Sequence, residues 1–340
     1  MTLPSKTLPL LCLAFAGASG VGTYLSAQHA GMPAGADLPR WAYPVLPASP
    51  VPSASGATPA RAQPSVVEHV PGSKAEYTSK EIPVLQVVPD WFPDEHPPMP
   101  PVVAHGRLPN LGACAHCHLP TGMGRPENQS IAGLSPEYMM QQVEDFRSGA
   151  RKSSEPRMAS VNNMILASKT ATPEEMKSAI AYFASLQPRR WIRVVETDTV
   201  PLTKIGSLML VVTDAAKSEP IGNRVIEVSE DQEQTELRNP KSGFVAYVPK
   251  GSLQIGESLV RTGGEGRTIA CTECHGVNLR GVGSIPSIAG RSPSQMTRQL
   301  MDFQTGARNG SGAVVMRGPV AKLTVADMVA ITGYLASLEP

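Results

Sequence analysis

Two short segments of the chain each hold a Cys-x-x-Cys pair that is followed at once by histidine. The segments are Cys114-Ala-His-Cys117-His118 and Cys271-Thr-Glu-Cys274-His275. This pattern is the attachment signal of a c-type haem. The two thiols of a pair each bond one vinyl group of the porphyrin, and the adjacent histidine, here His118 or His275, binds the iron on the proximal side. The sequence therefore predicts two covalently attached haem c groups.

Other uses of a Cys-x-x-Cys pair fit these segments less well. Four thiols can hold one structural zinc ion, but the two pairs are far apart in the chain and each has its own histidine. A thioredoxin-like dithiol would lie in a βαβ pattern, and neither pair does. A structural disulfide would not require histidine at the fifth position twice. Haem attachment is therefore the favoured interpretation.

The distal iron ligand of the second haem is predicted from the methionines, because no histidine follows His275 in the chain. The candidates are Met296, Met301, Met316 and Met328. Three of them lie in predicted helices, where packing is the expected role. Met316 lies in a loop with glycine and proline, eight positions before Thr324, and is the predicted ligand.

The first haem has two candidate distal ligands, Met158 and Met164. Met158 keeps nearly the spacing to the haem motif that Met316 has, whereas Met164 precedes Thr172 by eight positions, as Met316 precedes Thr324. We prefer Met164, with Met158 as the alternative. Ligation by His and Met raises the reduction potential and closes the iron to substrates. His116, at a variable position of the motif, is predicted to lie at the surface beside the haem edge.

An internal repeat surrounds these residues, at an offset of 157. The motif Ile131-Ala-Gly-x-Ser-Pro recurs from Ile288, and Gly149-Ala-Arg recurs from Gly306. A closing Tyr-x-Ala-Ser-Leu-x-Pro occurs from Tyr182 and again from Tyr334. The chain thus holds two copies of one domain.

The elements that position the motifs are predicted to be helices. Ser-Pro pairs at 135–136 and 292–293 resemble an N-cap followed by proline at the first helical position. Thr172 and Thr324 open the last helix of each copy, and apolar residues follow at helical spacing. Copy two also gains a short helix from Gly251 to Val260. Residues 191–250 hold β-branched and aromatic runs between turn residues, which predicts a β-rich connector.

The N-terminal part of the chain differs from the rest in composition. The apolar stretch after Lys6 predicts that residues 1–27 are a signal peptide or a membrane anchor, and hence that the protein is exported to the periplasm. Residues 28–70 are rich in Ala, Pro, Ser and Gly and are predicted to be a flexible linker. Domain one is placed at 71–190, including a Pro-rich arm that packs on it through Trp91 and Phe92, and domain two at 251–340.

The overall charge excludes some partners. The formal net charge is +1, so no broad positive field favours nucleic acid. A membrane is expected to be contacted only through an N-terminal anchor.

In its two motifs, its methionine loops and its helices ending in Tyr-x-Ala-Ser-Leu, the sequence resembles the class I c-type cytochromes. In its two-domain plan it is similar to the dihaem cytochrome c4-like proteins. The resemblance covers residues 105–188 and 251–340, and the Pro-rich arm and β-rich connector depart from it. It implies a mainly α fold of two tandem domains and electron transfer as the activity.

The sequence is also similar to cytochrome subunits that serve a periplasmic or membrane-bound dehydrogenase. The resemblance implies a dehydrogenase as donor, and a cytochrome or terminal oxidase of the respiratory chain as acceptor. We interpret the chain as an electron carrier and not an enzyme. The alternative is a peroxidase-like dihaem enzyme with one open haem.

Overall fold

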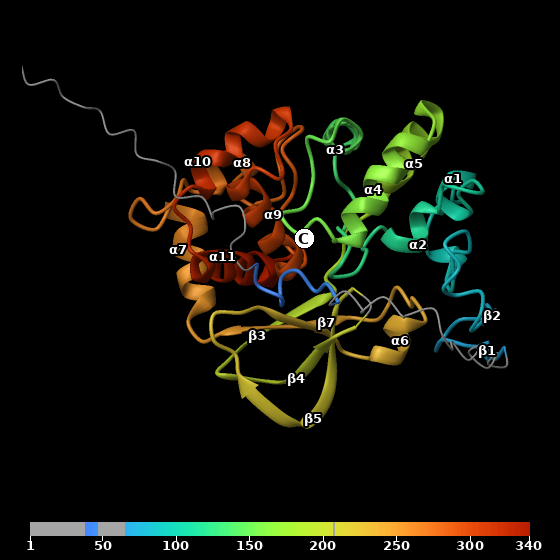
Figure 1. The fold of residues 1–340 in the computed structure, drawn as a ribbon, viewed down its shortest axis with the longest axis horizontal. Coiled ribbons are helices and arrows are strands. Elements are labelled where there is room, and N and C mark those ends of the chain that lie inside the picture. Colours follow the sequence, from blue (N-terminus) through green and yellow to red (C-terminus); the bar gives the residue numbers. More distant parts are fainter. Residues whose placement is uncertain (1–37, 47–64, 207) are drawn as a thin grey trace, which may run out of the picture.

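The computed structural model describes residues 38–46, 65–206 and 208–340. The predicted signal peptide or anchor, residues 1–27, lies outside the described residues, as do residues 28–37 and 47–64 of the predicted linker. Within the described residues, no helix combines the length and the apolar composition that a membrane span requires. Two helical domains lie beside each other, and strands between them in sequence lie below both (Figure 1).

The first domain is an arrangement of short helices preceded by an extended arm. The arm carries the small strands β1 (Val67–Glu68) and β2 (Tyr77–Thr78) and the 3₁₀ turn η1 (Pro93–Glu95). The helices are α1 (Pro101–Ala104), α2 (Cys114–His118), α3 (Pro136–Ser148), α4 (Ala159–Thr170) and α5 (Pro173–Ser185). Ser135 caps α3 through the Tyr138 N–H, and Thr172 with Glu175 forms a capping box on α5, as the sequence predicted.

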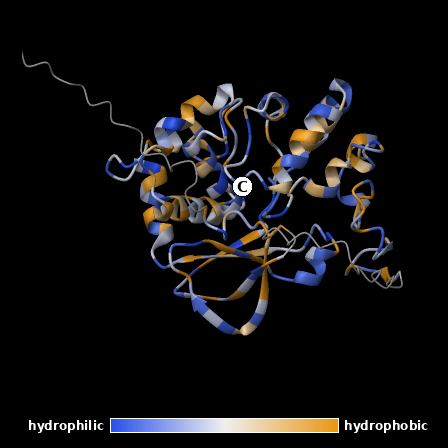
Figure 2. Ribbon diagram, viewed as in Figure 1, coloured by the Kyte–Doolittle hydropathy of each residue, from blue (hydrophilic) through white to orange (hydrophobic). Residues whose placement is uncertain are grey.

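The second domain repeats this order with a longer first helix. Its elements are α7 (Ser252–Thr262), α8 (Thr272–His275), α9 (Pro293–Thr305), η2 (Ser311–Met316), α10 (Arg317–Val320) and α11 (Val325–Ser337). Helix α7 lies against α11 so closely that a Cβ at Gly256 would be 2.1 Å from the Ala330 oxygen. In the first domain the single-turn helix α1 packs against α5, as α7 packs against α11 in the second. Most helices show hydrophobic and hydrophilic bands (Figure 2), as one-sided packing requires.

Strands occupy much of the connector, residues 191–250. Strand β7 (Phe244–Pro249) is central, pairing parallel with β3 (Ile192–Thr197) and antiparallel with β6 (Ile226–Ser229). A separate antiparallel pair consists of β4 (Thr199–Ile205) and β5 (Leu210–Pro220), and the short helix α6 (Gln232–Glu236) follows β6. The connector thus has a small core of its own, which includes Val200 and Ile226.

The two domains contact each other through matching residues of the repeat. Arg151 donates to Gln142 and to Gln299, both at 2.9 Å. Arg308, its counterpart, donates to Gln299 at 3.0 Å and to Gln142 at 2.8 Å. The backbones of Arg151 and Arg308 also form an antiparallel bridge. Both guanidinium groups are buried, so this interface is one continuous polar network.

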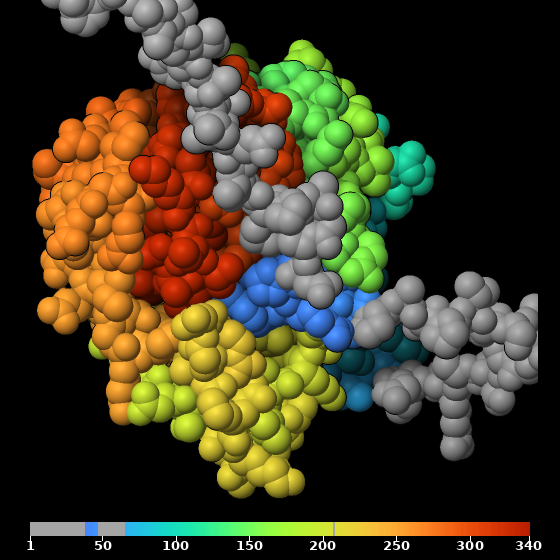
Figure 3. All heavy atoms as spheres, turned by 60° about the vertical axis from the view of Figure 1, so that its left-hand side comes forward, coloured from blue at the N-terminus to red at the C-terminus, as the bar shows by residue number. Residues whose placement is uncertain are grey.

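Residues 38–46 correct the prediction of a flexible linker over 28–70. Ala42 and Tyr43 are 0% and 2% exposed and belong to the apolar core of the second domain. The Tyr43 hydroxyl donates to Asp302 at 2.9 Å, and Arg298 donates to the Ala42 oxygen at 2.9 Å. In Figure 3 this blue segment lies between the red second domain and the yellow connector. The average composition of residues 28–70 concealed this segment, although Trp41 and Tyr43 were a signal that it packs.

We expect Tyr43→Phe to lower the free energy of unfolding by about 1 kcal/mol, because it removes one buried hydrogen bond while keeping the ring. Asp302 would retain the two bonds that Ser154 donates to its Oδ1. Urea denaturation measures the change. The matched control is Tyr247→Phe, which alters a hydroxyl on β7 and leaves Asp302 untouched. Equal midpoints for wild type and Tyr43→Phe would contradict a role for this contact.

Candidate haem sites

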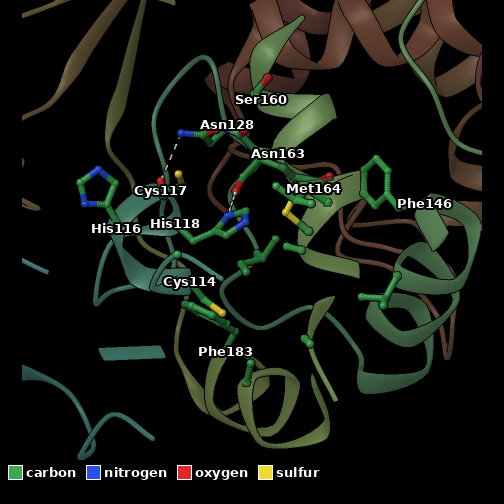
Figure 4. A pocket seen from close by; sticks show the side chains of 18 of the residues that line it. Cys114, His116, Cys117, His118, Asn128, Phe146, Ser160, Asn163, Met164 and Phe183 are labelled. Atoms are coloured by element: carbon green, nitrogen blue, oxygen red, sulfur yellow. Dashed lines mark hydrogen bonds between the residues drawn. The ribbon is translucent and has the colours of Figure 1, made fainter. Parts of the chain in front are cut away.

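A cavity of about 450 Å³ opens beside the first motif and has mostly apolar walls (Figure 4). Its size is in the range typical of cofactor sites. Side chains from α2, α3, α4 and α5 line it, and Cys114, Cys117 and His118 are among them. Several apolar residues of its walls belong to the first domain's core; they include Leu111, Leu134, Met139, Val143 and Phe183.

The proximal histidine of the first site is held in one orientation. His118 Nδ1 is 3.0 Å from the Gln129 carbonyl oxygen, which can only accept, so Nδ1 carries the proton. This leaves the Nε2 lone pair free to bind iron, the arrangement usual for a ligating histidine. Burial lowers the pKa of His118, which keeps the imidazole in its neutral, ligating form. The Phe183 ring contacts it edge-on, with centroids 5.8 Å apart.

The second site repeats the same detail. His275 Nδ1 is 2.8 Å from the Pro286 carbonyl oxygen, and Pro286 is the counterpart of Gln129 at the offset of 157. Burial again lowers the histidine pKa. Cys271, at the N-cap of α8, is half-buried and burial raises the pKa of its thiol to about 11, while Cys274 is exposed. All four motif cysteines are free thiols, as attachment to vinyl groups requires.

The two candidate distal ligands of the first site lie in different places. Met164 lines the cavity from α4, and its sulfur lies on the side toward which His118 points (Figure 4). Met158, the N-cap residue of α4, is 1% exposed and packs in the core of the second domain. The structure thus brings Met164, and not Met158, together with the motif.

Both preferred methionines lie in helical structure, where the sequence predicted loops. Residues 159–170 form α4 because this stretch contains neither Gly nor Pro. Met316 ends η2 and is half-buried against the second domain's core. The spacing from Met164 to the last helix, which favoured this residue, is unaffected by the difference, because α4 leads directly to α5.

His116 corrects a second prediction, because it is 2% exposed and not at the surface. Its Nδ1 is 3.0 Å from the Val87 carbonyl oxygen of the arm. Its own carbonyl oxygen accepts a hydrogen bond from Arg238 of the connector at 2.6 Å. The arm and the connector therefore meet at the first motif, which sequence reasoning did not reveal.

Positive charge gathers along the same cavity. Four arginines line it, against two glutamates: Arg125, Arg151, Arg238 and Arg298, with Glu127 and Glu175. Arg125 pairs with Glu127 at 2.5 Å, although its Nε is buried without a hydrogen-bond partner in the described part of the chain, and burial lowers the pKa of Arg238 to about 10. A haem carries two carboxylates, which such a group of guanidinium ions would balance. Apolar walls, an oriented imidazole and surplus cations together fit a haem.

A comparison with protein families identifies the second domain. Residues 263–339 match the family model "Cytochrome c". That range contains the motif Cys271–His275 and Met316. Residues 263–339 are therefore a cytochrome c domain.

Several curated proteins are similar to the chain. Cytochrome c4 of Stutzerimonas stutzeri is 31% identical over 136 residues, which are 36% of this chain and 64% of that protein. The match thus spans less than two thirds of that relative. A thiosulfate dehydrogenase electron acceptor of Thiomonas intermedia is 23% identical over 236 residues, covering 67% of this chain and 80% of the relative. The solved structures that are similar to this chain include reduced cytochrome c4 of Pseudomonas stutzeri. It has a TM-score of 0.43 and 22% identity, over 66% of this chain and 93% of that one.

Proposed function

We propose that the chain is a dihaem c-type cytochrome that carries single electrons between redox proteins. The observation that carries this proposal is the duplicated histidine geometry. In both copies the Nδ1–H of the motif imidazole donates a hydrogen bond to a carbonyl oxygen eleven positions later, which leaves Nε2 free for a metal. A histidine retained only for packing would not need this orientation twice.

The residues of the first site would hold a haem in different ways. Cys114 and Cys117 would supply the thioether bonds, and His118 and Met164 would bind the iron. The apolar walls exclude water, which favours the less charged, reduced state. The arginine side chains of the cavity would balance the porphyrin carboxylates. The haem would supply one-electron redox chemistry, and with His118 and Met164 both bound to its iron the site would leave no position for a substrate.

The second site would be held by Cys271, Cys274, His275 and Met316. Arg151 and Arg308 join the two domains through their shared glutamines. That contact holds the two haem-binding halves together, and electrons would pass between the two haems within one molecule.

We place the protein in the periplasm, between a dehydrogenase and the respiratory chain. The support is the name of one relative, an electron acceptor of thiosulfate dehydrogenase, and of another, the cytochrome subunit of a sulfide dehydrogenase. The electron donor would be a dehydrogenase of that general kind. Any attachment to a membrane would be through residues 1–27.

We expect both irons of the purified holoprotein to be six-coordinate and low-spin. Carbon monoxide added to the reduced protein should then leave the absorption spectrum unchanged, and hydrogen peroxide should not be turned over. In stopped-flow mixing with an oxidised blue-copper protein, each reduced chain should give up one electron from each of two haems. A high-spin haem that binds carbon monoxide would instead favour the peroxidase-like enzyme.

A further inference from the structure

The first domain alone does not close the cavity beside the first motif. Gln295, Arg298 and Gln299, three side chains of α9 in the second domain, are among the residues that line it. Arg298 is the charged one of the three. The second domain therefore contributes a cation to the cavity in which the first haem would lie.

Arg298 is held in place by two segments that are far from it in the chain. It is 5% exposed, and its guanidinium donates to the carbonyl oxygens of Ala42 at 2.9 Å and of Pro126 at 2.5 Å. Ala42 belongs to the N-terminal segment 38–46, and Pro126 to the first domain between α2 and α3. A charge that is buried and fixed acts on its surroundings more strongly than a mobile, hydrated one.

Arg298 lacks a counter-ion among the described residues, where its hydrogen bonds go to uncharged carbonyl oxygens. Burial raises the pKa of the neighbouring Asp302 and Glu227, which favours the neutral forms of both. Glu127, a third neighbour, is paired with Arg125. Burial also lowers the pKa of Arg298 itself, so its charge is costly at this position. A carboxylate in the cavity would offset that cost, because buried charges are stable when they are paired.

The internal repeat gives this charge no equivalent in the opposite direction. The counterpart of Arg298 at the offset of 157 is Gln141 of α3, which is uncharged and donates to Asp145 of its own helix at 2.9 Å. At this position the first domain thus offers no cation to the second site. The charge of Arg298 would therefore act on one of the two haems more than on the other.

We propose that Arg298, although it belongs to the second domain, is part of the first haem site and raises the reduction potential of that haem. A nearby positive charge favours the reduced state, because reduction brings one electron to the iron. An ionic contact with a porphyrin carboxylate would act in the same direction, because it offsets a negative charge beside the iron. This inference rests on the proposed haem at the first motif, and it adds a residue from outside that domain which sets the potential.

The test removes the charge in the full holoprotein by Arg298→Gln and, as a second variant of similar length, by Arg298→Met. A redox titration followed by absorption resolves the two one-electron steps, and the step that Met164→Ala lowers identifies the first haem. We expect the equilibrium constant for reduction of the first haem to fall about tenfold, which is about 59 mV for a one-electron couple. The step of the second haem should move less. Arg298→Lys, which keeps the charge, should restore most of the potential.

The matched control is Thr297→Val, at the neighbouring position of α9. Thr297 is fully buried and its hydroxyl lies 3.0 Å from that of Thr332, but it carries no charge and does not line the cavity. The control should lower the stability of the second domain and leave both potentials unchanged. An unchanged first step in the charge-free variants, or an equal fall in Arg298→Lys, would overturn the role of the charge. A wild-type protein without a covalent haem at the first motif would instead refute the proposed function.

Discussion

Replacing Cys271 and Cys274 together with serine is expected to leave one covalent haem per chain in place of two. Serine cannot form a thioether, so the second motif would lose its attachment while the first keeps Cys114 and Cys117. The pyridine haemochrome assay measures the ratio of haem to protein. A denaturing gel stained for haem shows whether the remaining group is covalently bound.

The reciprocal double variant, Cys114→Ser with Cys117→Ser, is the control and should also retain one haem. We expect it to be the less stable of the two, because the walls of the 450 Å³ cavity in the first domain would lose the porphyrin that they contact. A chain that keeps two covalent haems after either change would refute the assignment of both motifs.

Met164→Ala is expected to remove the distal ligand of the first haem. The oxidised protein should lose part of its weak sulfur-to-iron absorption band, and the potential of that haem should fall. The reduced variant should bind carbon monoxide at one iron only. Redox titration and the carbon monoxide difference spectrum measure these changes. Met316→Ala should have the corresponding effect on the second haem.

Met158→Ala separates ligation from packing. Met158 is 1% exposed in the second domain's core, so truncation should lower the free energy of unfolding by about 2–5 kcal/mol. The spectrum and both potentials should remain those of the wild type. If Met158→Ala abolishes the sulfur band and Met164→Ala does not, Met158 is the ligand and the spacing to the motif was the better guide.

Local signals in the sequence predicted the elements that local interactions stabilise. The Ser-Pro pairs and the threonines at 172 and 324 mark the beginnings of four helices, because capping depends on residues three positions apart. The repeat placed Arg151 and Arg308 at equivalent positions, although it did not show that they meet.

Contacts between distant residues could not be predicted in this way. Residues 38–46 lie within a segment predicted to be a linker, yet Tyr43 is fixed by Asp302, 259 positions away. Arg238 meets His116 across 122 positions, with only an unremarkable turn sequence around it. Such contacts depend on how the domains and the connector pack, which no spacing in the sequence records.

The contact between the two domains has a twofold character. Arg151 reaches Gln299 while Arg308 reaches Gln142, and the Lys152 N–H bonds the Ala307 oxygen while the Asn309 N–H bonds the Ala150 oxygen. Each of these two contacts therefore occurs twice, once in each direction between the copies, as in a symmetric homodimer. A single-domain ancestor with Arg and Gln at these positions would have paired with itself. Gene duplication and fusion would then have turned a dimer of separate chains into the two halves of one, and left its symmetry in the interface.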